Sequence, residues 1–464
     1  MATFQPTGAL ERTLFPRTSY SQFASVFFLL IACAVVILGI VLQNYYVLAI
    51  PPAVLLLIKY PVELPLGVFA FLIPFDSVLM LGQSGHTLTW LTGAAAGGIV
   101  LAYGVLSGRL TAPPRAALWW GLFILWGAAS LLWALDPGQA LERLPTALLL
   151  FLLYLVVVSF RISQRELAVV ILCVIAGGVF ASGYTLREFS QGTGFFSRAS
   201  LIVSGQDSNP NDFADSLLLP LALALGGFFS ARTLLKRGGM LVAALIITYC
   251  VLSTMSRGSA VAVAAVLFVY LFRLGVRVKT TVAIALIVVL LLFLPQLFFS
   301  RMQDSVTSRA EGRWDIFIVG TQVVRHYGIL GAGLESFRAA YTKFAGFAPI
   351  FRGFGRDPHN IYLQVWAELG LVGLFLFLAA IWSQLRDLHK GIRGRTGSPD
   401  YLLLALESAC WALLIHGFSG NLLWRKEFWM AWILAALAVQ LRHTSQENVG
   451  QSPILPRHWH PQRV

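Results

Sequence analysis

Charged residues are scarce in this sequence. Lys, Arg, Asp and Glu make up 12% of its 464 residues, whereas hydrophobic residues make up 57%. Soluble domains contain about 25% charged and about 45–50% apolar residues. The composition therefore excludes an ordinary soluble domain and predicts an all-α polytopic membrane protein, because apolar helices of sufficient length can cross a bilayer.

Patterns that bind metals or nucleotides are also missing. The four cysteines lie singly inside apolar runs, which predicts neither a disulfide framework nor a metal site. The sequence has no HExxH or DxD pattern, and GAGLES from Gly331 lacks the Lys-Ser/Thr ending of a nucleotide-binding loop. We therefore expect no metal ion and no cofactor.

Long apolar runs, by contrast, are abundant. A transmembrane helix needs about 17–25 apolar residues. Because several candidate runs are short or closely spaced, we expect about 12–14 helices, from the runs near 22–41, 45–58, 64–81, 88–107, 116–134, 145–160, 167–184, 213–230, 239–255, 257–273, 280–299, 361–384, 401–417 and 428–441.

The basic residues predict how these helices are oriented. With a cytoplasmic N-terminus, every inner segment carries at least one Lys or Arg, while the short outer loops carry almost none. The net charge of +13 is therefore first a signal of orientation, and we expect no nucleic-acid partner. We predict one transmembrane domain over 1–442 and a disordered cytoplasmic tail over 443–464, which is polar and rich in proline.

One outer loop, 300–360, is long and strongly basic. It carries eight Lys and Arg residues, Arg338 among them, and such charge on the outer face suggests an anionic ligand. We expect the loop to be partly helical, to form an amphipathic lid and to contain a second short helix over 334–345. Its first helix has residues at helical spacing, namely Trp314, Phe317, Ile318, Thr321 and Val324.

After this loop, a polar segment opens directly into an apolar helix. Asp357 can cap the helix and Pro358 suits its first position, which would place His359 and Asn360 in the first turn. The positive end of the helix dipole disfavours a charged imidazole there. His359 can therefore act as a proton acceptor, although a boundary histidine that only packs fits the sequence equally well.

A polar stripe continues down the same helix. Gln364 and Glu368 follow Asn360 at four-residue intervals, so the three side chains share one face. A carboxylate at the depth of Glu368 should face the bundle interior and have a partner. The stripe can bind substrate, or it can simply hold helices together.

Arginines mark two further places on the outer side. Arg257 lies between two apolar runs, where it either reaches lipid headgroups or binds an anion such as phosphate. Arg187 and Arg198 belong to the other long outer loop, which ends in Asn-Pro-Asn-Asp. Asn211 or the aspartate after it can cap the next helix.

Four segments together resemble a known family. They are NPNDFA at 209–214, SRGSAV at 256–261, GRWDIF at 312–317 with GAGLESF at 331–337, and HNIYLQVWAELGLVGL at 359–374. Their residues and order are similar to those of the O-antigen ligase and O-antigen polymerase superfamily of integral membrane glycosyltransferases. The resemblance covers about residues 190–440, and the histidine-containing segment is the most specific part.

The resemblance implies an enzyme at the periplasmic face of the bacterial cell inner membrane, in contact with membrane lipids. A ligase moves a glycan from undecaprenyl diphosphate to a sugar hydroxyl of lipid A-core, whereas a polymerase moves it to another undecaprenyl-linked repeat. The motifs would make His359, Arg257 and Arg313 the catalytic residues of a metal-independent reaction. We expect donor and acceptor to contact a wider set, namely Arg198, Arg187, Asn211, Asn360, Arg338 and Glu368.

Two alternatives remain at this point. A transporter of polysaccharide or lipid-linked glycan should show internal repeats and ionisable groups near the bilayer centre. We find no repeat, and the acidic residues within spans are few: Asp76, Glu368 and Glu407. An enzyme is therefore favoured. A ligase is preferred over a polymerase, although both share the motifs.

Overall fold

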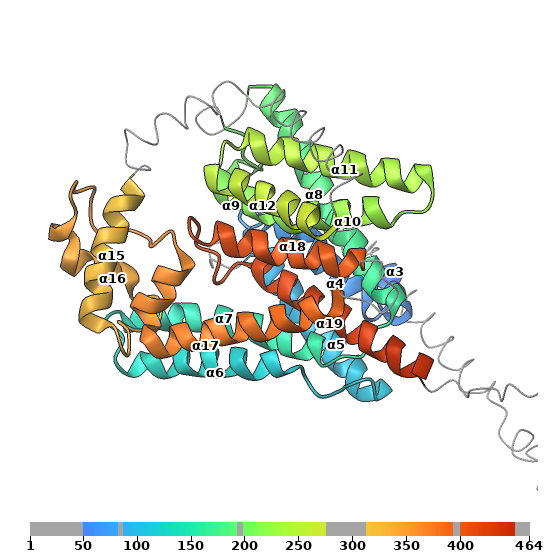
Figure 1. The fold of residues 1–464 in the computed structure, drawn as a ribbon, viewed down its shortest axis with the longest axis horizontal. Coiled ribbons are helices and arrows are strands. Elements are labelled where there is room, and N and C mark those ends of the chain that lie inside the picture. Colours follow the sequence, from blue (N-terminus) through green and yellow to red (C-terminus); the bar gives the residue numbers. More distant parts are fainter. Residues whose placement is uncertain (1–49, 82–86, 193–197, 275–311, 393–399, 451–464) are drawn as a thin grey trace, which may run out of the picture. The chain divides into compact units, whose positions relative to one another are not determined.

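The computed structural model describes residues 50–81, 87–192, 198–274, 312–392 and 400–450 (Figure 1). The spans expected near 22–41 and 280–299 lie outside the described residues, as do residues 300–311 and 451–464. The chain forms two compact units, Met1–Leu64 and Pro65–Val464. The described part of the first unit contains α3 (Ile50–Lys59) and the start of α4 (Glu63–Leu72).

The described residues confirm an all-α polytopic membrane protein. Seven of their helical segments are long and apolar enough to cross a membrane, or eight if the short helices Pro52–Lys59 and Glu63–Phe75 count as one span. The seven segments are α5 (Leu88–Ser107), α6 (Arg115–Ala129) with η3 (Ser130–Leu132), α7 (Pro137–Val158), α8 (Gln164–Ser190), α9 (Pro210–Ser216) with α10 (Leu218–Ser230), α11 (Leu234–Ser253) and α17 (Ile361–Ile392).

The remaining elements connect or flank these segments. They are η2 (Ile73–Phe75), a small hairpin of β1 (Ile202–Val203) and β2 (Gln206–Asp207), α12 (Arg257–Leu274), α15 (Arg313–Tyr327), α16 (Phe337–Phe344), η5 (Ala345–Phe347), α18 (Tyr401–His416) and α19 (Lys426–Gly450). Helix α19 continues past residue 442, where we expected the polar tail to begin.

Local sequence signals explain several helix starts. Thr87 caps α5 by accepting a hydrogen bond from the Trp90 amide. Ser163 and Glu166 form a reciprocal capping box at the start of α8. Asp136 caps α7 and is followed by Pro137, so this helix starts before residue 145, where its apolar run begins. Arg143 is therefore part of a helix instead of an outer loop.

Two groups of helices make up the second unit. In one group α10 and α12 pack against α18, and α11 packs against α10 (Figure 1). In the other, α6 runs along α17, and α5 along α7. Helix α19 contacts α7, α17 and α18. Trp120 of α6 is fully buried among aromatic rings from α17 and α19, including Phe377 and Trp429, and these rings fill the core.

The segment after Gly312 packs on the start of α17. Helices α15 and α16 form where the sequence predicts two short helices. The packed face of α15 consists of Ile316, Val319 and Val323, which form a core with Leu363 of α17. Trp314 and Phe317, which we expected on the amphipathic face, stack on each other and stay largely exposed.

Helix α17 is broken inside its apolar run. Gly370 has φ of 67° and ψ of −166°, which is not a helical conformation. A side chain at this position would meet the Ile329 carbonyl oxygen, 2.1 Å from an ideal Cβ. Glycine is therefore required both for the backbone conformation and for the close approach of the 328–333 segment.

Candidate functional site

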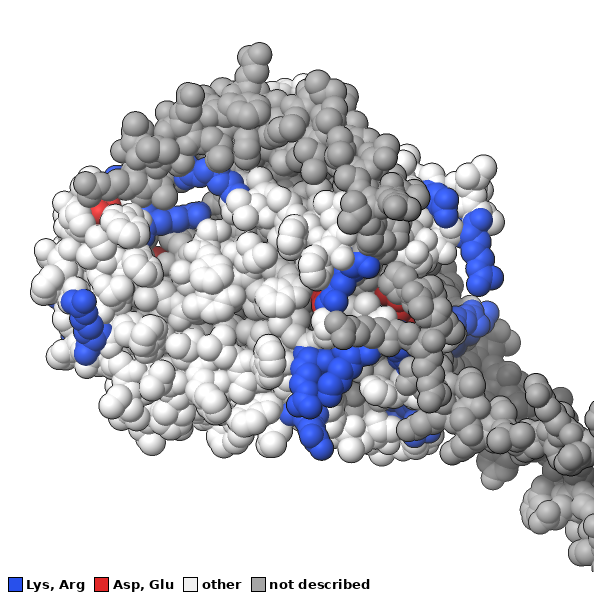
Figure 2. Space-filling view, viewed as in Figure 1, with Lys and Arg blue, Asp and Glu red and all other residues white. Residues whose placement is uncertain are grey.

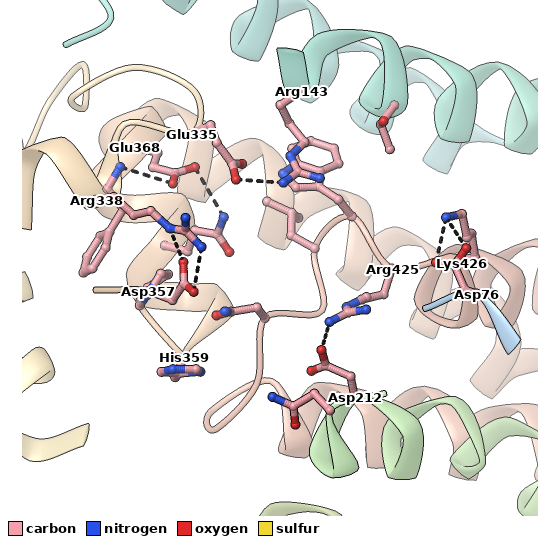
Figure 3. Close-up of a pocket in the computed structure, with 18 of the residues that line it drawn as sticks. Asp76, Arg143, Asp212, Glu335, Arg338, Asp357, His359, Glu368, Arg425 and Lys426 are labelled. Carbon is pink, nitrogen blue, oxygen red and sulfur yellow. Dashed lines mark hydrogen bonds and ion pairs between the residues drawn. The ribbon is translucent and has the colours of Figure 1, made fainter. Parts of the chain in front are cut away.

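The second unit contains a polar cavity of about 490 Å³, which we call the paired-charge cavity (Figure 3). It lies where several helices begin. Its walls come from the end of η2, the starts of α5, α7, α9, α17 and α19, and the loop before α16. The charged and histidine side chains that line it are Asp76, Arg143, Asp212, Glu335, Arg338, Asp357, His359, Glu368, Arg425 and Lys426.

The start of α17 differs from the expected capping. The helix begins at Ile361, and the Asn360 side-chain oxygen accepts hydrogen bonds from the amides of Tyr362 and Leu363, both at 3.0 Å. Asp357, which we expected to cap the helix, accepts two hydrogen bonds from Arg338 at 2.6 and 2.9 Å. Asn360 is thus the cap, because its short side chain can reach back to the first helical amides.

His359 therefore precedes the helix instead of lying in its first turn. Its φ of 45° is in the left-handed region, which is uncommon for residues other than glycine and occurs often at functional sites. Burial lowers the pKa of His359, and the positive charge of Arg313 lowers this pKa further, while Asp357 opposes the shift. The imidazole is consequently neutral near pH 7 and can accept a proton.

Glu368 lies deeper in the same cavity. Its side chain is buried, with one oxygen 3.4 Å from the Phe337 amide and the other 3.5 Å from the Gln364 amide nitrogen. The three residues of the predicted polar stripe therefore have different roles. Asn360 caps the helix, whereas Gln364 and Glu368 line the cavity.

The GAGLESF segment explains why Glu368 has this partner. The break at Gly370 frees carbonyl groups of α17, and the amides of Ala332 and Gly333 donate to the carbonyls of Ala367 and Glu368, each at 2.8 Å. A side chain at Gly331 would meet the Glu368 carbonyl oxygen at 2.2 Å. The glycines therefore let two backbones dock, which brings the residues that follow them to the cavity.

Four ion pairs line the cavity. Each of its Lys and Arg side chains contacts a carboxylate, and the pairs are Arg143 with Glu335 at 2.9 Å, Arg338 with Asp357 at 2.6 Å, Lys426 with Asp76 at 2.7 Å, and Arg425 with Asp212. Against these four cations stand five carboxylates, Glu368 included. The cavity is therefore rich in hydrogen-bonding groups but nearly balanced in charge.

Several of these residues were not among the predicted site residues. Arg143 carried a signal, because it was the one basic residue in a short outer loop. Asp76 stood out as an acidic residue within an apolar run. Arg425 and Lys426 had no recognisable pattern. Their role depends on carboxylates far away in the sequence, which only the fold reveals.

The predicted arginines of the first outer loop have different environments. Arg198 is buried, donating to the Thr254 carbonyl at 2.8 Å and to the Asn211 side chain at 2.7 Å. Neither Arg198 nor Asn211 lines the cavity, although Asn209 beside them does. Arg187 is exposed in the last turn of α8 and is not a lining residue either.

Arg257 and Arg313 also lie outside the cavity lining. Arg257 begins α12, and Gly258 beside it packs against His416, whose ring is 2.9 Å from an ideal Cβ at Gly258. Arg313 begins α15, and its charge acts on both His416 and His359. Arg313 is thus electrostatically close both to His416, which packs against the Ser-Arg-Gly motif, and to His359 at the cavity wall.

His416 belongs to a buried polar cluster at the start of α12. Its Nε2 atom lies 2.8 Å from an Asp215 carboxylate oxygen, and the Ser259 hydroxyl donates to the same oxygen at 3.1 Å. Asp215, Ser259 and His416 are all nearly inaccessible to solvent. The cluster fixes α9, the start of α12 and the end of α18 against one another, which positions Arg257.

Comparison with known families supplies the remaining observation. Residues 242–378 match the family model described as O-antigen ligase. The resemblance to the O-antigen ligase superfamily is confirmed. The O-antigen ligase match contains Arg257, Arg313, Arg338, His359 and Glu368, whereas the Asn-Pro-Asn turn precedes it. A search of curated proteins found no match to the chain. The family indicates a glycosyltransferase-like membrane enzyme whose substrates are lipid-linked glycans.

Proposed function

We propose that this protein is an O-antigen ligase-like glycosyltransferase. It moves a glycan from undecaprenyl diphosphate to a sugar hydroxyl of lipid A-core at the periplasmic face of the bacterial inner membrane. The observation that carries the proposal is the position of His359 at the wall of a polar cavity. The pKa of this histidine is lowered by burial and by the positive charge of Arg313.

The paired-charge cavity suits the sugars better than the diphosphate. Its cations are already neutralised by carboxylates, so the field that an added anion would meet is weak. Sugar hydroxyls can both donate to these carboxylates and accept from these cations. Trp90 and Trp424 add aromatic surfaces to the wall. Glycan binding is the use that this lining supports.

Arg257 and Arg313 are the proposed diphosphate-binding residues. Guanidinium groups match phosphate oxygens with two parallel hydrogen bonds. Both arginines also begin helices, whose first amides favour an anion. Negative charge grows on the diphosphate as the sugar–oxygen bond breaks, so cations placed there stabilise the transition state.

In the proposed reaction the acceptor hydroxyl oxygen attacks the anomeric carbon of the donor sugar. The bond between that carbon and the diphosphate oxygen breaks, and undecaprenyl diphosphate leaves with the electron pair. His359 takes the hydroxyl proton. The family resemblance implies inversion at the anomeric carbon.

We propose that no metal ion takes part. The support is the arrangement of the acidic side chains, since Asp76, Asp212, Glu335 and Asp357 are each paired with a cation and thus already used. Arginines then perform the charge stabilisation that a divalent cation performs in other transferases.

The test is release of undecaprenyl diphosphate from a lipid-linked glycan by the purified full chain. Lipid A-core and a second undecaprenyl-linked repeat are supplied separately as acceptors, each with and without EDTA, and His359→Ala is the control. Transfer to lipid A-core in EDTA is the expected result. Transfer only to the second repeat would identify a polymerase, and activity restored only by added magnesium would contradict the metal-independent mechanism.

A further inference from the structure

A second cavity, of about 600 Å³, lies at the other end of the helices. It is formed by the connection from α5 to α6, the end of α7, the second half of α17 and the end of the apolar part of α19. Helices α7, α17 and α19 each contribute residues to both cavities. Along α19 the distance from Lys426 to Val439 is about 20 Å at 1.5 Å per residue. The two cavities are therefore separated by most of the thickness of a bilayer core.

The charges of this second cavity, which we call the basic cavity, are unbalanced. It is lined by Arg115, Arg161, Arg386 and Lys390, with His443 at its edge and Asp387 as the only acidic lining residue. Among the residues that the structure describes, none of these four cations forms an ion pair. On the face shown in Figure 2, one group of Lys and Arg side chains lies in the lower half, and others lie near the top and along the right edge.

Membrane orientation alone does not account for this gathering. The orientation signal requires Lys and Arg on the correct side of the membrane, and cations spread along separate loops would provide it. Here Arg386 and Lys390 are four residues apart on α17, and like charges at that spacing repel each other. Arg115 and Arg161 come from other elements and face the same hollow. Such a cluster raises the local positive potential, which favours an anion in the hollow.

We propose that the basic cavity binds the phosphate headgroup of an anionic membrane lipid. Three observations support a lipid over a soluble phosphate compound. The cavity lies at the end of membrane-spanning helices, where headgroups lie. Its four cations are exposed and so accessible from the interface. Apolar side chains, Val158 and Val439 among them, continue the lining toward the helix interior and can contact an acyl chain.

The test compares two double variants of the full chain, purified in detergent. The cavity variant is Arg386→Gln with Lys390→Gln. The matched control is Arg232→Gln with Lys236→Gln, which removes two exposed cations that do not line the cavity. Native mass spectrometry measures the apparent Kd of added phosphatidylglycerol and, separately, of phosphatidylcholine. Because the protein is in detergent, any effect of the substitutions on membrane insertion does not enter the measurement.

We expect the cavity variant to bind phosphatidylglycerol about 25-fold more weakly than the unmodified chain, since each cation near a headgroup contributes roughly a fivefold factor. The control variant and all phosphatidylcholine titrations should change little. Equal weakening in both variants, or none in either, would overturn the proposal. A third titration adds free glycerol phosphate to the lipid-bound protein. Displacement of phosphatidylglycerol at comparable concentrations would assign the cavity to a soluble phosphate compound and overturn the lipid assignment.

Discussion

The paired-charge cavity and the basic cavity share three helices, α7, α17 and α19, yet their charged side chains are arranged in opposite ways. In the first, every Lys and Arg side chain contacts a carboxylate, whereas in the second the cations stand together without ion pairs among the described residues. Charge pairing produces a wall that can hydrogen-bond a neutral, polyhydroxylated molecule. Unpaired cations produce a field that attracts an anion.

The pairing of charges in the first cavity also suggests that the sugar and the diphosphate of the donor bind at different places. If the paired-charge cavity contacts sugar, then the diphosphate must depend on Arg257 and Arg313, which lie outside its lining. His359 lies between these two places: it lines the cavity, and the positive charge of Arg313 lowers its pKa.

The largest effect is expected in thiol labelling, which reports the side of the membrane on which each cavity opens. In a chain without its native cysteines, Gly346→Cys reports on the α16 region and Ala112→Cys reports on the basic cavity. Both positions are exposed. We expect an impermeant thiol reagent to label only Gly346→Cys in intact cells, and both variants after permeabilisation. Equal labelling before permeabilisation would contradict the opposite placement of the cavities.

Removal of the proposed base should have the next largest effect. His359→Ala should lower turnover roughly 10²–10⁴-fold, because the acceptor proton then has no positioned group to receive it. Donor affinity should be nearly unchanged, and Lys236→Gln on α11 serves as the control that leaves both quantities intact. Single-turnover rates and donor Kd measure the two effects. A donor Kd that worsens as much as turnover would make His359 a phosphate ligand instead.

The arginines should behave differently from the histidine. Arg257→Ala and Arg313→Ala should each lower turnover by about 10²–10³-fold and should weaken donor binding as well, because their charge contacts the diphosphate before and during bond cleavage. Lysine at either position should restore only part of the loss, since it keeps the charge but not the planar pair of donors. If lysine restored turnover and donor binding fully, paired hydrogen bonds from a guanidinium group to the diphosphate would not be needed.

A smaller effect is expected at the break between the two cavities. Gly370→Ala should destabilise the protein by about 1–3 kcal/mol from backbone strain, plus the clash with the Ile329 carbonyl. Gly98→Ala is the control, because open space surrounds a Cβ at that position. Thermal unfolding measures both. Glycan transfer should fall with Gly370→Ala, whereas phosphatidylglycerol binding at the basic cavity should persist. Loss of both activities would mean that the structure of one cavity depends on that of the other.

The smallest effect is a displacement of the pH profile. A general base works when it is neutral, so kcat/KM should fall as the pH drops through the pKa of His359, which lies below the ordinary value of about 6.5. Arg313→Gln removes a cation that lowers this pKa, and the acid limb should move to higher pH. Asp357→Asn removes the carboxylate that raises it, and the limb should move to lower pH. Each displacement should be less than about one pH unit, and movement in the same direction would contradict the assignment.

Much of the fold could be predicted from the sequence, because apolar length and capping residues are local signals. The ranges of α5, α12 and α18 follow their apolar runs closely, whereas α8 extends six residues past its predicted end and includes Arg187. The cap of α17 was assigned to the wrong residue, since Asp357 and Asn360 are both good caps and only the tertiary contact with Arg338 decides between them.

The candidate site was less accessible from the sequence. Motifs predicted Arg257, Arg313 and His359, and polar spacing predicted Glu368. Of these four, His359 and Glu368 line the cavity. The ion pairs of the cavity could not be predicted from the sequence. Lys426 and Asp76, for example, are far apart in the chain, and neither belongs to a motif. The role of GAGLESF was also hidden. Its glycines look like those of an anion-binding loop, and only the break at Gly370 shows that they accommodate a second backbone.

The docking of residues 331–333 onto the break of α17 determines where the chain can change its length. Adding or deleting one residue within 331–333 would move the Ala332 and Gly333 amides out of line with their carbonyls. A change between 334 and 337 would shift Glu335 or Arg338 relative to its ion-pair partner. Between 346 and 355 the constraint is weaker. A side chain at Gly346, Gly353 or Gly355 would meet open space, and the contacts of this stretch include one hydrogen bond from the Gly355 amide to the Thr342 hydroxyl and the ion pair of Arg352 with Asp315. Relatives of this protein should therefore vary in loop length in the second stretch and keep the first at a constant length.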